Sequence, residues 1–77
     1  MKKTNEVLEA LVSHEGVNLS DYYSITMRRN DMSLQGDFSS YVMKKMREHF
    51  NVEFRLEEDM LMAQFNFEGV LINITLT

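Results

Sequence analysis

The side chains best suited to chemistry in this 77-residue chain are the basic ones in the stretch GDFSSYVMKKMREHF. Lys44, Lys45 and Arg47 fall within four positions of one another on a predicted helix, so their charges would share part of one surface. With Tyr41 nearby to stack on a base, they are a candidate site for nucleic acid or another anion. The alternative is the solvated side of an ordinary amphipathic helix, because cations late in a helix complement its dipole.

Other catalytic or metal-binding groups are few. The chain has no cysteine, which excludes disulfides, thiolate–zinc sites and thiol nucleophiles. His14 and His49 are both expected near helix ends, where a histidine interacts favourably with the helix dipole. The acidic run at 57–59 is expected at a hairpin tip, where solvated carboxylates make poor general acids. There is also no P-loop, GxGxxG or HExxH motif, so we expect no enzymatic activity, no cofactor and no metal site.

The composition is that of a folded protein, with 44% apolar and 26% charged residues, and 77 residues leave room for one domain spanning 1–77. The formal net charge is −4, but residues 28–47 contain five basic and two acidic residues. An acidic chain binds nucleic acid poorly overall, so this basic middle would act only as a local patch. No apolar run is long enough to span a membrane, and acidic residues interrupt the apolar region near the N-terminus. We therefore expect a cytoplasmic protein that does not bind membranes.

Two segments have the apolar spacing of amphipathic helices. The first spans residues 4–15, with Thr4 or Asn5 as its N-cap and Gly16 as the left-handed residue that ends it. Its apolar face consists of Val7, Leu8, Leu11 and Val12. The second is expected to start from Asp37 as its N-cap. Its apolar stripe consists of Phe38, Val42, Met46 and Phe50.

The remaining segments alternate between apolar and polar residues, as half-buried strands do. They are residues 21–30, 32–35, 52–57, 60–67 and 70–77. In the first of them, Tyr23 is expected to face the core and Tyr22 to face away from it. Two-residue turns at 30–31, 58–59 and 68–69 would keep the apolar residues of all the hairpins on one face. The predicted fold is therefore α+β, with two helices packed on one face of an antiparallel sheet in the order α-β-β-α-β-β-β.

The opposite face of this sheet is less polar than a solvated surface usually is. Met60, Met62 and Leu71 point outward from neighbouring strands, which is typical of a protein-interaction surface, although scattered surface hydrophobics are also common. A small domain gains stability from additional burial, so self-association through this face or through a free edge strand is also expected. The sequence therefore favours a non-enzymatic protein-interaction module or small accessory or regulatory protein. Nucleic-acid or anion binding by Lys44, Lys45 and Arg47 is the alternative.

Overall fold

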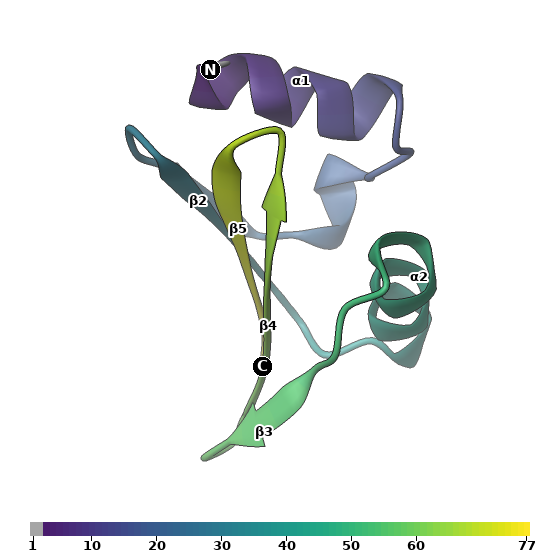
Figure 1. Cartoon of the computed structure of the whole chain (residues 1–77). Helices are drawn as coiled ribbons and strands as arrows, with labels where there is room; N and C mark the ends of the chain where they lie inside the picture. The colour runs from purple at the N-terminus through teal and green to yellow at the C-terminus, as the bar shows by residue number, and fades with distance from the viewer. Residues whose placement is uncertain (1–2) are drawn as a thin grey trace.

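The computed structural model describes residues 3–77 and contains two α-helices and five strands in the order α-β-β-α-β-β-β (Figure 1). The helical segments are α1 (Thr4–Ser13), the short 3₁₀ helix η1 (Leu19–Asp21) and α2 (Ser40–Phe50). The strands are β1 (Ser24–Met27), β2 (Asp31–Gly36), β3 (Arg55–Glu57), β4 (Met60–Phe67) and β5 (Val70–Leu76). The predicted α+β class and element order are confirmed. No helix among the described residues is long and apolar enough to cross a membrane.

All five strands form one sheet in the order β1-β2-β5-β4-β3. The hairpins pair antiparallel, but β2 and β5 run parallel, with Met32 opposite Ile72 and Leu34 opposite Ile74. The sheet is therefore mixed, and the prediction of a purely antiparallel sheet was wrong. The physical reason is the long connection through α2, which takes the chain from β2 to the far edge of the sheet at β3. The meander of β3, β4 and β5 then brings β5 back beside β2 in the same direction.

Two of the three predicted hairpin registers are confirmed. Leu56 pairs with Leu61 across the turn at 58–59, and Phe67 pairs with Val70 across the turn at 68–69. Gly69 has a φ of 85°, in the left-handed region that glycine adopts without strain. The turn positions predicted from the sequence therefore agree with both of these registers.

The first hairpin turns one position earlier than predicted. Arg28 N–H donates to Asp31 O at 2.8 Å, so the turn consists of residues 29–30, and Met27 lies opposite Met32 rather than Leu34. This difference shifts the pairing by two residues. Because side chains alternate with a period of two, the paired residues 24–27 and 32–35 keep their predicted faces of the sheet.

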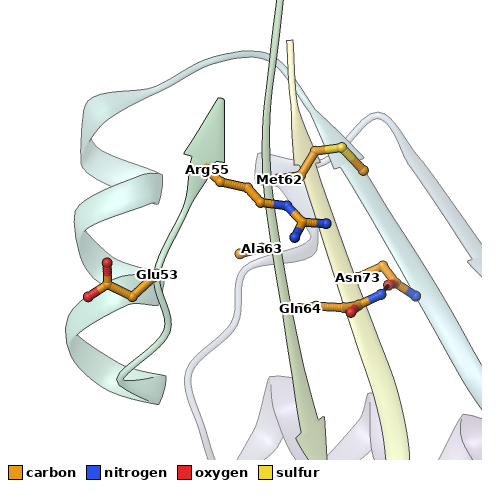
Figure 2. A pocket seen from close by; sticks show the side chains of 6 residues that line it. All are labelled: Glu53, Arg55, Met62, Ala63, Gln64 and Asn73. Atoms are coloured by element: carbon orange, nitrogen blue, oxygen red, sulfur yellow. Dashed lines mark hydrogen bonds between the residues drawn. The ribbon is translucent and has the colours of Figure 1, made fainter. Parts of the chain in front are cut away.

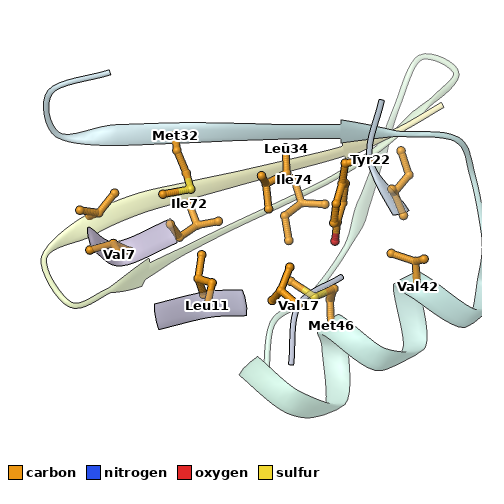
Figure 3. Packing of buried hydrophobic residues seen from close by; sticks show 12 residues of the cluster. Val7, Leu11, Val17, Tyr22, Met32, Leu34, Val42, Met46, Ile72 and Ile74 are labelled. Carbon is orange, nitrogen blue, oxygen red and sulfur yellow. The ribbon is translucent and has the colours of Figure 1, made fainter. Parts of the chain in front are cut away.

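One hydrophobic core lies between the sheet and the two helices, both of which pack on the same face (Figure 3). The sheet contributes alternate residues of its central strands, and each helix contributes residues from one side. The central contributors are Val7 and Leu11 of α1, Val42 and Met46 of α2, Met32 and Leu34 of β2, and Ile72 and Ile74 of β5. The face of the sheet opposite this core faces away from both helices.

Both helices begin differently from the prediction. The N-cap of α1 is Lys3, and Thr4 Oγ1 lies instead 2.6 Å from Arg28 O and 2.9 Å from Arg29 O, which fixes the helix to the first hairpin. The N-cap of α2 is Ser39, whose hydroxyl accepts a hydrogen bond from the N–H of Val42 at 3.3 Å. Asp37 is therefore not the cap, because the chain is still extended beyond it. Phe38, expected on the apolar stripe, precedes the helix and is 56% exposed.

The segment that leads into β1 also differs from the prediction. A strand was expected from residue 21, but η1 occupies residues 19–21, and the side chain of Asn18 accepts from Ser20 N–H at its start. This turn changes the alternation, so Tyr22 is buried in the core and Tyr23 is 61% exposed. The predicted orientation of the two tyrosines was therefore wrong.

The strand β3 is shorter and more exposed than predicted. Only Arg55–Glu57 pair with β4, and all three residues are exposed. Val52 is buried in the connection that precedes the strand, and Phe54 is half-buried. Leu56 faces the helical side but is 70% exposed, because β3 is an edge strand whose inner face neither helix covers. The expected burial of Leu56 was therefore wrong.

Candidate functional site

The main candidate site is the outer face, which we define as the sheet face opposite the helices. The strand registers place its side chains in rows that run across the sheet. The central row is Thr26, Ser33, Asn73 and Gln64, and the next row is Ser24, Gln35, Thr75, Met62 and Arg55. Most of these side chains are polar but uncharged, and Met62 interrupts them with an apolar group.

A hydrogen-bonded amide pair occupies the middle of the outer face. Gln64 Nε2 donates to Asn73 Oδ1 at 2.6 Å, and Asn73 Nδ2 donates to Met32 O at 3.2 Å. This pair separates two parts of the predicted interface, because Met62 lies opposite Thr75 whereas Leu71 lies opposite Asn66. Four residues along β4 correspond to about 13 Å. Met60 and Met62 are therefore neighbours on the outer face, and Leu71 lies at its other end.

A hollow of about 250 Å³ lies beside Met62 at the boundary between β3 and β4 (Figure 2). Its lining residues are Glu53, Arg55, Met62, Ala63, Gln64 and Asn73. The side chain of Arg55 reaches from β3 across β4, and Gln64 and Asn73 lie next to each other on the adjoining strands. The hollow therefore combines a guanidinium donor, a free amide oxygen on Gln64 and the apolar methionine side chain.

Tyr23 is an additional residue of this face that the sequence did not indicate. Its hydroxyl lies 3.3 Å from Thr77 Oγ1, and the β4–β5 register continued by one residue places Thr77 beside Met60. Tyr23, Met60 and Met62 thus gather at one end of the outer face, which we call the methionine end. The signal that would have revealed Tyr23 is the Asn18-Leu19-Ser20 turn, since an Asn side chain that caps its own turn shifts the alternation that follows.

The charges on the outer face cancel in pairs. Arg28 Nε lies 2.7 Å from Asp31 Oδ1, and Arg28 Nη2 also donates to Ser33 Oγ at 2.7 Å. The hydrogen bond to Asp31 raises the pKa of Arg28 above its usual value, so this guanidinium stays charged. At the opposite edge, Arg55 Nε lies 3.5 Å from Glu57 Oε2. These two ion pairs therefore add no net charge to the outer face, although the whole chain has a formal charge of −4.

The basic residues predicted to bind an anion lie elsewhere, on the outer surface of α2. Lys44 and Arg47 are exposed, and Lys45 is half-buried with its Nζ 6.0 Å from the centroid of the Tyr41 ring. A second hollow, of about 290 Å³, is lined by Tyr41, Lys44, Lys45 and Glu48. Arg47 does not line this hollow. The helix therefore brings together two of the three predicted cations, the predicted aromatic ring and one carboxylate.

His14 and His49 do not share a site with each other, and neither belongs to the outer face. His49 Nε2 lies 2.9 Å from Glu15 Oε1. This contact links the last turn of α2 to the turn that follows α1. The His49 ring also makes an edge-to-face contact with Phe50, with 4.7 Å between the ring centroids. His14 is the exposed C-cap residue of α1. Within residues 3–77, no three His, Asp or Glu side chains are arranged to hold a metal ion.

Comparison of this chain with protein-family models, with curated proteins and with solved structures finds no match. The contacts and charges of its own surfaces are therefore the basis for the function proposed below.

Proposed function

We propose that this protein acts by binding another protein and that the methionine end of the outer face is the binding surface. The observation that carries the proposal is the gathering of Tyr23, Met60 and Met62 on a face that no described helix covers. Aromatic and methionine side chains are enriched at the centres of protein interfaces, and unbranched methionines adapt to partners of different shape. The role is proposed to be non-enzymatic, accessory or regulatory, in the cytoplasm.

The charge distribution supports a protein partner at this face. Ion pairs that are already formed within one molecule leave little uncompensated charge to desolvate on binding. Arg28 with Asp31 and Arg55 with Glu57 are such pairs at opposite margins of the face. Association here should therefore depend weakly on salt, unlike binding that relies on unpaired surface charges.

The size of the face indicates a transient complex. Five strands at a spacing of about 4.8 Å, with central strands of six to eight residues, give a surface of roughly 20 by 20 Å. That is about half of the roughly 800 Å² that each partner contributes to an interface of standard size. We therefore expect weak, reversible binding unless the partner also contacts an edge of the sheet.

A photocrosslinking residue at position 62 tests the proposal, with the same residue at the exposed position of Glu9 on α1 as the control. A protein captured from position 62 but not from position 9 would then be purified and its affinity measured at two salt concentrations. We expect Met62→Glu to weaken that binding by at least about tenfold, with little effect of salt on the wild-type affinity. Equal capture from both positions, or an affinity that Met62→Glu leaves unchanged, would contradict the proposal.

A second candidate function is anion or nucleic-acid binding by α2. It is favoured by the hollow in which Lys44 and Lys45 lie beside the exposed ring of Tyr41. It is weakened by Glu48 in the same hollow and by the position of Arg28, which lies on the outer face as predicted and adds no charge to α2. We therefore favour protein binding at the methionine end over anion binding by α2.

A further inference from the structure

The strand β1 leaves backbone hydrogen-bonding groups free at one edge of the sheet. Arg28 N–H donates to Asp31 O, and side-by-side pairs along an antiparallel ladder alternate between bonded and non-bonded. The backbone groups of Thr26 therefore point toward β2, and those of Ile25 and Met27 point away from the sheet. Within residues 3–77, no other strand pairs with this edge.

This edge has fewer of the features that usually prevent strand pairing than the opposite edge has, although β1 has only four residues. Sheet edges are commonly protected by charged side chains, proline, bulges or very short strands. β1 is Ser24, Ile25, Thr26 and Met27, which includes no charge and no proline, and Met27 is 48% exposed. The other edge strand, β3, has only three residues, includes Arg55 and Glu57, and is followed by the acidic residues at 58–59.

We infer that β1 is a self-association site at which a second copy of this chain pairs antiparallel, about a two-fold axis that passes beside Thr26. In this register, Ile25 lies opposite Met27 of the second copy, and the free N–H and C=O groups of these two residues form four backbone hydrogen bonds. Two-fold axes centred on Ile25 or on Met27 would use fewer of the free groups. The inference is independent of the proposed function, because it concerns an edge of the sheet and not the outer face.

The charges of the chain favour this edge over the alternatives. Two copies with a formal charge of −4 each repel one another, so a contact is favoured where little charge is brought together. About the axis at Thr26, Arg28 lies opposite Ser24 of the second copy, and no like charges face each other. The same operation at β3 would place Arg55 opposite Glu57, but it would also place Glu53 opposite Asp59, so like charges would face each other there. The paired copies would form one continuous ten-stranded sheet with both outer faces open on the same side.

The two-fold axis makes Thr26 the residue that tests the inference, because it is exposed and faces its own copy directly. We expect sedimentation analysis between about 10 μM and 1 mM to detect a weak dimer of the wild type. Thr26→Lys and Thr26→Glu should each raise its dissociation constant by about fivefold or more, since each places like charges opposite one another. An equimolar mixture of the two variants should restore dimerisation, because Lys and Glu then face each other across the axis.

The matched control is Asn66→Lys, which adds a charge at an exposed outer-face position of β4 far from this edge. It should leave the dimer at or near its wild-type strength. A wild type that stays monomeric up to about 1 mM, equal effects of Thr26→Lys and Asn66→Lys, or a mixture that fails to dimerise would overturn the inference. A dimer that Met62→Glu dissociates and Thr26→Lys does not would also overturn it, and would place self-association on the outer face instead. Capture of a partner at position 62 is a separate measurement, so the proposed function and the dimer can fail independently.

Discussion

The ring of Tyr22 packs against Gly36, where an added β-carbon would lie 3.2 Å from Tyr22 Cδ1 and 2.6 Å from Asp21 O. Gly36 ends β2 at an inward position opposite Leu76, so its missing side chain lets η1 approach the sheet closely. The contact buries Tyr22 and thereby directs the next residue, Tyr23, to the outer face. One small residue in the core thus determines which tyrosine is available at the methionine end.

Gly36→Ala should destabilise the protein. The new methyl group would collide with backbone at Asp21, which cannot move without shifting η1, and overpacking of this kind typically costs about 1 to 3 kcal/mol. Urea unfolding followed by circular dichroism measures the change in the free energy of unfolding. Gln35→Ala, at the exposed neighbouring position, is the control and should have a much smaller effect. An unchanged unfolding midpoint in Gly36→Ala would show that η1 does not pack here.

The stability of the protein should fall at alkaline pH because of Tyr22. Burial, with a smaller contribution from the Asp21 carboxylate, raises the pKa of Tyr22 from 10.0 to about 12. The folded state therefore holds this proton more tightly than the unfolded state does. The resulting stabilisation is complete below pH 10 and is lost as the pH rises from 10 to 12, up to about 2 to 3 kcal/mol.

Tyr22→Phe isolates this effect, because it removes the titrating hydroxyl and keeps the ring. The difference in unfolding free energy between wild type and variant should change between pH 10 and 12 and stay constant between pH 7 and 9. Tyr41→Phe is the control, since that ring is exposed and lies on the surface of α2. Identical pH profiles for wild type and Tyr22→Phe would mean that the hydroxyl titrates equally in both states.

The start of α2 can be tested with one pair of variants. Ser39→Ala removes the hydroxyl that accepts from the N–H of Val42 and should lower the free energy of unfolding by about 1 kcal/mol. Asp37→Ala should have a clearly smaller effect, because Asp37 lies two residues before the cap. Thermal unfolding of both variants compares them directly. A larger loss of unfolding free energy in Asp37→Ala than in Ser39→Ala would mean that Asp37, and not Ser39, caps α2.

The two ends of the outer face should respond differently to the same chemical change. Leu71→Glu and Met62→Glu each add one carboxylate at a half-buried outward position, on β5 and β4 respectively. We expect Met62→Glu to weaken binding of the partner captured at position 62 by at least about tenfold, and Leu71→Glu to weaken it by less than about threefold. Calorimetric titration of both variants gives the two affinities. Equal losses would extend the binding surface across the Gln64–Asn73 pair to Leu71.

The basic surface of α2 should contribute little to nucleic-acid binding. Fluorescence anisotropy with labelled single- and double-stranded oligonucleotides compares the wild type with a Lys44/Lys45/Arg47→Ala triple variant at two salt concentrations. We expect no more than weak binding by the wild type at low salt, because the chain is acidic and Glu48 lies within the same hollow. Binding that is tight, salt-sensitive and lost in the triple variant would instead make α2 the functional site.

Much of the fold follows from residues close together in the sequence. The period-two pattern of 70–76 identifies the buried residues of β5. The turn at 58–59 gives the predicted register between β3 and β4, and the turn at 68–69 gives the predicted register between β4 and β5. The spacing of Val42 and Met46 likewise identifies the buried side of α2. These features depend on backbone geometry and turn chemistry within a few residues, and the sequence determines them by itself.

Only the tertiary structure decided how distant segments meet. The parallel pairing of β2 with β5 joins residues on either side of the α2 crossover, and no local pattern encodes its direction. The same is true of the methionine end, where Tyr23 reaches Thr77 because Gly36 admits η1 against the sheet, while the Gln64–Asn73 pair keeps Leu71 apart. Periodicity tells which side of its own element a residue occupies, but the choice of neighbour depends on how the packed elements bury their apolar faces together.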